Sequence, residues 1–114
     1  MPHIILFQNE GLIGQHMHVF TPFKNLNGSG VGFNDITSSF VILEGDWQFF
    51  KDWDYQTPFP LGAKQAAVFG PGVYISMSAL GGGSNDSLSS LRPVQLVNGV
   101  WEPLPFPSEP RPIG

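Results

Sequence analysis

The chain alternates short apolar runs with polar or glycine-rich breaks, and the first such unit occupies residues 4–20. Residues 4–7 (Ile-Ile-Leu-Phe) run into a polar stretch, which is typical of a strand that enters a turn. Residues 15–20 then predict the returning strand. His16 and His18 share one face of that strand, because side chains alternate along it. The pattern therefore predicts a β-hairpin at the start of the chain.

Three further runs repeat this type of pattern. Residues 40–45 form a β-branched run bounded by glycine and predict a central strand. Residues 47–55 hold the densest cluster of aromatic side chains, and residues 91–94 predict the end of the last strand. We expect the aromatic cluster to be buried, because aromatic side chains dominate small cores. A sugar- or base-stacking platform is the alternative, with Trp53 as the side chain that burial explains least. Together the runs predict an all-β fold.

The segments between these runs are rich in glycine, proline and asparagine. Residues 28–32 (Gly-Ser-Gly-Val-Gly) resemble a phosphate-binding loop only superficially, because such a loop needs a helix after it and a strand follows here. Residues 81–84 predict a second flexible loop. The last residues, 95–114, are rich in proline, which favours an extended tail. A docking ligand for a proline-reading module is the alternative for this tail.

Composition narrows the possible functions. The 114 residues suffice for one domain, and three Trp, two Tyr and ten Phe argue for a packed fold despite 14 Gly and 11 Pro. A net charge of −4 with only five Lys and Arg provides no basic patch, so neither nucleic acid nor an anionic membrane is expected as a partner. The acidity favours a cation. Cysteine is absent from the sequence, which excludes disulfides and thiol catalysis.

No signal peptide or membrane span is visible in the sequence, because the N-terminal residues have no basic region and no long apolar run. The localisation is left open by the sequence. No Gly-x-Ser-x-Gly elbow, His-Glu-x-x-His pair or cofactor fingerprint is present either. We therefore expect a protein that is not an enzyme, without catalytic residues or an organic cofactor. His16 and His18 could bind a transition metal, but the sequence offers no third ligand at usable spacing, so a polar strand face is the default.

One hexapeptide occurs twice. Residues 34–39 read Asn-Asp-Ile-Thr-Ser-Ser, and residues 85–90, 51 positions later, read Asn-Asp-Ser-Leu-Ser-Ser. Each copy places a carboxylate, a hydroxyl and backbone carbonyls within a short stretch, and these are the hard oxygen ligands that calcium takes. The alternative is that both copies are turns or helix caps that satisfy local backbone groups. Repetition in register favours the calcium interpretation and indicates a tandem repeat.

The two hexapeptides resemble the Asn/Asp-Asn/Asp-x-x-Ser/Thr-Ser calcium signature of the βγ-crystallin superfamily, in its microbial calcium-binding single-domain type. In that family a hairpin precedes each signature, with an aromatic residue, a second aromatic five residues later and a glycine after two more. Here the first hairpin begins at Phe7 and has Leu12 at the second aromatic position. The second hairpin begins at Phe50 and has Thr57 at the glycine position. The resemblance covers about residues 3–94.

Residues 69–74 are also similar to the Gly-Pro-Gly-x-Tyr corner of the family's second motif. The resemblance implies eight strands in two intertwined Greek-key motifs that form a β-sandwich, each motif lending a strand to the other's sheet. The domain would comprise residues 1–94, with motif one at about 3–45 and motif two at about 46–94. Residues 95–114 would be a Pro-rich C-terminal extension.

Two calcium ions per chain are further implied, each ligated across both motifs. Two aspartate carboxylates, two serine hydroxyls and four backbone carbonyls would supply the protein ligands. Carried over residue by residue, the metal ligands are Gln8, Asp35, Ile36, Ser38, Lys51, Asp86, Ser87 and Ser89. The last serine of each signature, Ser39 and Ser90, is implied to hydrogen-bond the folded hairpin over the sheet.

The leading hypothesis is thus a monomeric calcium-binding domain in which two ions stabilise the fold and which has a structural or binding role. A second hypothesis is an interaction or inhibitor module, in which the long loop from Tyr55 to Phe69 or the Pro-rich tail meets a protein or glycan. Calcium would then only hold the scaffold. A third hypothesis is a degenerate domain that binds no ion.

Overall fold

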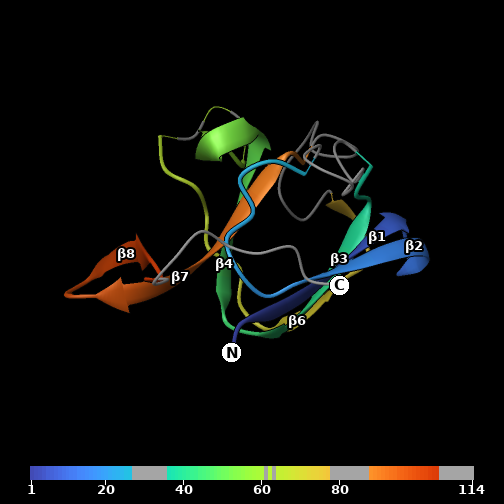
Figure 1. Cartoon of the computed structure of the whole chain (residues 1–114), viewed down its shortest axis with the longest axis horizontal. Helices are drawn as coiled ribbons and strands as arrows, with labels where there is room; N and C mark the ends of the chain where they lie inside the picture. Colours follow the sequence, from blue (N-terminus) through green and yellow to red (C-terminus); the bar gives the residue numbers. More distant parts are fainter. Residues whose placement is uncertain (27–35, 61, 63, 78–87, 106–114) are drawn as a thin grey trace.

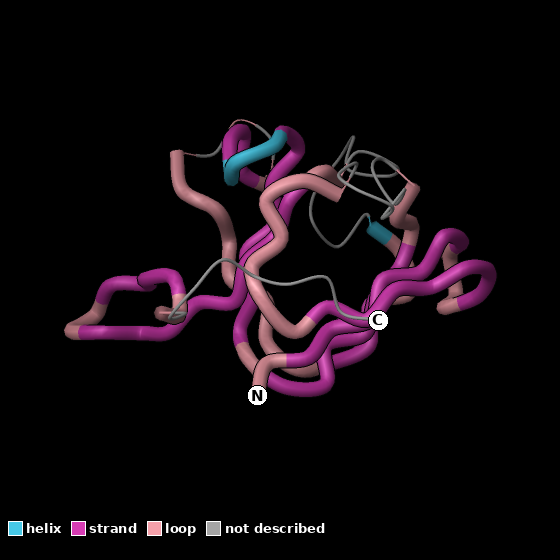
Figure 2. Tube along the Cα trace, in the orientation of Figure 1, coloured by secondary structure: helices cyan, strands magenta, loops and turns pink. Residues whose placement is uncertain are grey.

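Two four-stranded antiparallel sheets make up the protein (Figures 1 and 2). The computed structural model describes residues 1–26, 36–60, 62, 64–77 and 88–105. Apolar side chains from both sheets form one core between them. The fold is therefore the predicted all-β sandwich. Within the described residues, no helix has the length and apolar character needed to cross a membrane.

The first sheet has the strand order β2-β1-β3-β6. Its members are β1 (His3–Asn9), β2 (Ile13–Val19), β3 (Ser39–Glu44) and β6 (Gly72–Tyr74). Leu6 is paired with Met17 of β2 on one side and with Phe40 of β3 on the other, and Phe40 in turn pairs with Tyr74 of β6. Because β6 belongs to the second half of the chain, motif two lends a strand to the sheet of motif one, as predicted.

The second sheet has the order β5-β4-β7-β8. Its members are β4 (Asp46–Asp52), β5 (Gln56–Pro58), β7 (Ser90–Val97) and β8 (Val100–Pro103), and the 3-10 helix η1 (Trp53–Tyr55) joins β4 to β5. The contribution of motif one to this second sheet is short. Motif one reaches this sheet through an isolated bridge, in which Phe23 and Leu91 exchange backbone hydrogen bonds of 2.9 and 3.1 Å.

The core follows from strand alternation. Ile4 and Leu6 are buried while their neighbours on β1 face outward, as expected for a sheet with one covered face. Opposite them, Trp47 and Phe49 are fully buried on β4. The rings of Phe40 and Phe49 join the two sheets with their centroids 4.9 Å apart. Burying one such side chain contributes about 1.5–3 kcal/mol, so the expected aromatic core is also a main source of stability.

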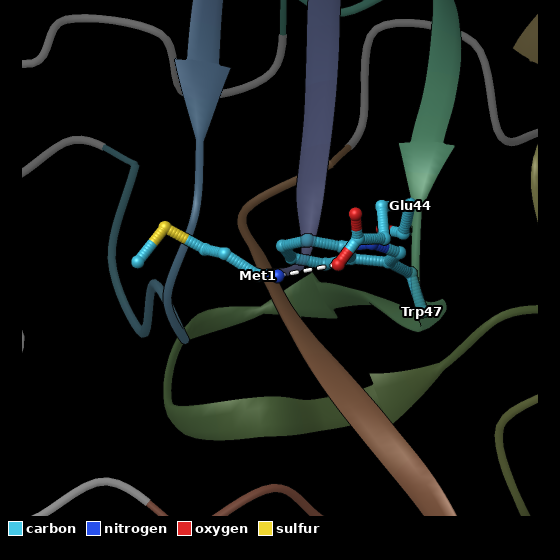
Figure 3. Close-up of polar contacts among 3 residues, drawn as sticks. All are labelled: Met1, Glu44 and Trp47. Atoms are coloured by element: carbon cyan, nitrogen blue, oxygen red, sulfur yellow. Dashed lines mark hydrogen bonds and ion pairs between the residues drawn. The ribbon is translucent and has the colours of Figure 1, made fainter.

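Tyr74 and Trp47 of motif two each donate a hydrogen bond to a backbone carbonyl. The Gly-Pro-Gly-x-Tyr corner is present: the Tyr74 hydroxyl donates to the Gly70 carbonyl at 2.8 Å, and its ring stacks on Phe40. At the start of motif two, the Trp47 indole Nε1 donates to the Glu44 carbonyl at 3.2 Å, and the Met1 amino group contacts the Glu44 carboxylate (Figure 3). Trp53, by contrast, is 51% exposed.

The last strand extends further than the sequence indicated. We expected it to end near Val94, but β7 continues to Val97 and turns back at Asn98 and Gly99 into β8. The two strands form an arm that projects from the sandwich, at the left of Figure 1. The sequence had placed the end of the strand at residues 91–94, whereas β7 continues past Pro93, which pairs with Trp47. The division into a domain of residues 1–94 and an extension of 95–114 remains a prediction.

Candidate metal centre

The first hairpin folds through left-handed backbone. Gly11, Leu12 and Gly14 have φ values of 77°, 63° and 89°. A Cβ at position 14 would lie 2.6 Å from Nδ2 of the Asn9 side chain, so only glycine fits there without a shift of that side chain. The tip is anchored to the other motif, because the Gly11 amide donates to the Ile75 carbonyl at 2.9 Å.

The second hairpin repeats this backbone 43 residues later. Asp54, Tyr55 and Thr57 take the same three positions with φ values of 55°, 62° and 56°. Thr57 therefore adopts the left-handed conformation of the missing glycine, which is uncommon for a β-branched residue. Its hydroxyl hydrogen-bonds the Asp52 carboxylate and thereby helps to hold the turn. This tip is anchored across motifs as well, since the Asp54 amide donates to the Lys24 carbonyl at 2.9 Å.

The last serine of each signature fastens its hairpin. The Ser39 hydroxyl donates to the Asn9 carbonyl at 2.5 Å and accepts from the Leu12 amide at 3.0 Å. The Ser90 hydroxyl donates to the Asp52 carbonyl at 2.6 Å and accepts from the Tyr55 amide at 3.2 Å. The hairpin-fastening role predicted for Ser39 and Ser90 is confirmed.

The preceding serine of each signature links the motifs through its backbone. The Ser38 amide donates to the Phe7 carbonyl at 2.9 Å, and the Ser38 carbonyl accepts from the Met77 amide at 2.8 Å. Ser89 makes the matching contacts, donating to the Phe50 carbonyl at 3.0 Å and accepting from the Leu26 amide at 2.9 Å. Each signature is thus bonded to its own hairpin on one side and to the other motif on the other side.

These contacts bring predicted metal ligands together in pairs. Phe7 is paired with Ser39, so Gln8, the next residue of β1, lies beside Ser38. Phe50 is paired with Ser90, so Lys51 lies beside Ser89. Gln8 and Lys51 are exposed, which suits backbone carbonyls that bind an ion at the surface. Ile36, two residues before Ser38, is half-buried and packs against the core. The arrangement fits oxygen ligation of a hard cation.

The remaining predicted ligands, Asp35, Asp86 and Ser87, lie outside the described residues. In the part of the chain that the structure describes, no three His, Asp or Glu side chains are grouped around one point as metal ligands. The predicted ligands among the described residues are thus the backbone carbonyls of Gln8, Ile36 and Lys51 and the hydroxyls of Ser38 and Ser89. The carboxylate ligands would have to come from Asp35 and Asp86.

The comparisons with known proteins agree with this geometry. The profile of the family Beta/Gamma crystallin matches residues 3–94. A beta/gamma-crystallin of Ciona intestinalis is 33% identical over 92 residues, which is 81% of this chain and 98% of the relative. The chain belongs to the βγ-crystallin family.

Solved structures of βγ-crystallins have the same fold. A beta/gamma-crystallin structure from Ciona intestinalis matches with a TM-score of 0.63 and 31% identity over 80% of this chain and 98% of its own. A transition-metal-ion-binding βγ-crystallin from Methanosaeta thermophila matches with a TM-score of 0.64 and 26% identity, over 80% and 99% of the two chains. The similarity thus covers nearly the whole of both relatives.

This βγ-crystallin domain also has a cleft that the sequence did not reveal. The cleft, of about 610 Å³, lies between the segment from Gln56 to Ala66 and the arm formed by β7 and β8. Arg92 forms part of its wall, with the guanidinium 5.1 Å from the ring centroids of both Phe50 and Tyr55. Trp101, 39% exposed, also lines it. No local signal could have found this cleft, because Trp101 lies 46 positions after Tyr55 in the sequence.

Proposed function

We propose that this βγ-crystallin domain is of the microbial calcium-binding type and binds two Ca²⁺ ions, which stabilise its fold. The observation that supports the proposal is the duplicated layout of an exposed strand residue beside a signature serine, Gln8 with Ser38 and Lys51 with Ser89. Two sites built alike are what the repeated hexapeptide predicts. Calcium suits them because it accepts carbonyl, hydroxyl and carboxylate oxygens in a flexible shell.

The ligand set assigns each residue a distinct contribution. Asp35 and Asp86 supply the negative charge, Ser38 and Ser89 supply hydroxyls, and the backbone carbonyls of the other residues complete the protein's share. These carbonyls belong to Gln8, Ile36, Lys51 and Ser87. Since each ion would meet about one carboxylate, we expect dissociation constants on the order of 10⁻⁵ to 10⁻⁴ M, weaker than in calcium buffers with several carboxylates.

The role that follows is that of a non-catalytic, monomeric structural or binding module. Calcium would stabilise the ends of the two hairpins, where left-handed backbone concentrates, and would thereby reinforce the links between motifs made by Ser38 and Ser89. The ions would act on stability by mass action, because a ligand that binds only the folded state raises its stability.

Isothermal titration of the metal-stripped chain with Ca²⁺ tests the proposal. We expect two ions per chain, and we expect Mg²⁺ to compete poorly because it demands a smaller octahedral shell and retains its waters. The Mg²⁺ titration serves as the control for unspecific charge screening. A stoichiometry of zero for Ca²⁺ would contradict the proposal and leave the signatures as turn and packing elements.

The cleft beside the arm favours a second candidate function, the recognition of a glycan by a calcium-stabilised scaffold. Its lining combines aromatic rings, Tyr55 and Trp101, with the amide side chains of Gln48, Gln56 and Gln65. Rings that stack on apolar ligand faces, together with amides that donate and accept hydrogen bonds, are typical of small-molecule sites. The observation supports the interaction hypothesis for the loop between Tyr55 and Phe69.

A glycan array probed with the full chain checks this second candidate. Trp101→Ala should lose the signal, because it removes the exposed ring from the cleft. Trp53→Ala is the matched control, since Trp53 is an exposed tryptophan on η1 that does not line the cleft. Equal losses in both variants, or no binding by the wild-type chain, would argue against a glycan site.

A further inference from the structure

All three histidines of the chain lie together on the outer face of the first sheet. His16 and His18 alternate with buried or half-buried residues on β2, and His3 comes from β1. The β1–β2 register pairs Ile5 with His18 and Ile4 with Val19, which brings His3 beside His18. The hairpin therefore supplies the third imidazole that the sequence did not place next to the His16–His18 pair.

Two of the imidazoles are already at the spacing of metal ligands. His3 Nε2 and His18 Nδ1 are 2.8 Å apart and share one proton in a hydrogen bond. Two nitrogens bound to one ion at about 2.0–2.1 Å lie roughly 2.8–3.4 Å apart, depending on whether the angle between them is square or tetrahedral. A metal ion can therefore replace the shared proton without a change in the spacing of the two nitrogens, once each ring has turned to point its lone pair at the ion rather than at the other ring.

The third imidazole is close but does not yet converge. The His16 and His18 rings meet edge to face with their centroids 5.3 Å apart. This offset explains why no three described side chains are grouped around one point for a metal ion. His16 is exposed, so its side chain can rotate toward the His3–His18 pair at low cost, and waters can complete the shell.

Neighbouring aromatic rings hold the pair in place. Phe20 stacks on His3 with a centroid distance of 4.3 Å and an interplanar angle of 27°, and Phe7 lies 5.8 Å from the His16 ring. The Phe20 stacking restricts the rotamers of His3, so less conformational entropy is lost when this ring binds an ion. The alternative is that the five rings only form a cross-strand stack that stabilises the hairpin.

We propose that His3, His16 and His18 bind one divalent transition-metal ion of the zinc, nickel and copper class. Imidazole nitrogens suit these ions, whereas Ca²⁺ takes oxygen ligands, so this site differs in ligand chemistry from the two signatures. This histidine site does not depend on calcium binding. A chain without calcium sites would keep its three histidines in the same hairpin.

Titration of the metal-stripped full chain with Ni²⁺ and with Zn²⁺ tests the site. The wild type should bind one ion per chain, and His3→Gln, His16→Gln and His18→Gln should each raise the dissociation constant by about tenfold or more, because each removes one ligand. Gln15→Ala is the matched control, because Gln15 is exposed on the same strand and directly precedes His16. It should bind as the wild type does.

A second measurement keeps the test valid if a variant fails to fold. Co²⁺ or Ni²⁺ added to the isotope-labelled wild-type chain should broaden the ring resonances of His3, His16 and His18 at one equivalent, and Ca²⁺ should leave them unchanged. Absence of binding, or a wild-type dissociation constant in His16→Gln, would overturn the three-histidine site. The rings would then be a stacking element only.

Discussion

At the scale of single residues, the signature serines show how a repeated side chain shapes this fold. Each hydroxyl of Ser39 and Ser90 serves two backbone groups of a hairpin that bends back over the sheet. Serine is suited to this position because its hydroxyl donates one hydrogen bond and accepts others from a very small volume. Both side chains are fully buried, so water cannot take over the role.

Ser39→Ala and Ser90→Ala should each lower the free energy of unfolding by about 1–3 kcal/mol, because a part-buried carbonyl and amide lose their partner. Urea denaturation of the metal-free chain measures this loss. Ser76→Ala is the control, since the Ser76 hydroxyl donates to the Glu10 carboxylate in an exposed contact. A loss of similar size in Ser76→Ala would mean that the hairpin bonds have no special weight.

At the scale of elements, the arm of β7 and β8 is the feature that departs most from a two-motif sandwich. It begins where the sheet ladder with β4 stops, at Val94, and continues as a two-stranded ribbon in which Leu96 pairs with Trp101. All four residues of β8 are exposed, so β8 adds little apolar burial to the core. Its contribution is one wall of the cleft.

A chain that ends at Val94 should therefore still fold and keep its calcium binding, with a melting temperature only a few degrees lower. The small cost reflects the loss of a two-stranded ribbon, which is marginal on its own. A chain that ends at Pro105 is the control, because it removes the C-terminal residues and keeps β8. If the shorter chain fails to fold while the longer one folds, β8 is part of the domain rather than an extension.

At the scale of the whole molecule, the proposed ions would couple the two motifs. The backbone of each signature is bonded to both motifs, so an ion held there stabilises contacts between them as well as its own hairpin. A ligand that binds only the folded state adds RT ln(1 + [L]/Kd), about 2.7 kcal/mol per site at a hundredfold excess. For a domain of this size we expect calcium to raise the melting temperature by roughly 10 to 20 °C.

Asp35→Ala or Asp86→Ala should abolish most of this calcium-induced rise and leave the metal-free melting temperature unchanged or slightly higher. Without the ion these carboxylates add negative charge to an already acidic chain, so their removal costs little. Thermal melts in calcium and in chelator measure both effects. Glu102→Gln, which removes one exposed carboxylate from β8, should keep the full rise. Retention of the full rise in both aspartate variants would contradict the ligand assignment.

Local patterns account for much of this fold. The apolar runs at 4–7, 15–20 and 40–45 correspond to strands β1, β2 and β3, because alternation and β-branching act within a few residues. The hairpin-fastening role of Ser39 and Ser90 came instead from the resemblance to the family signature, because their partners lie 27 to 38 residues earlier in the chain. Thr57 is instructive as a departure: the sequence identified it at a glycine position, and the structure shows that it adopts the left-handed backbone expected of glycine.

The sequence by itself determined the all-β class, the two repeats and the turns, since each depends on neighbouring residues and their backbone preferences. Only the tertiary structure decided that His3 joins His18, that β7 continues into β8, and that Arg92 and Trp101 line one cleft with the Tyr55 loop. The histidine contact and the cleft join segments separated by 15 to about 45 residues, whereas β7 and β8 are neighbours joined by a tight turn. Their geometry depends on strand register and sheet order, which a short window of sequence does not encode.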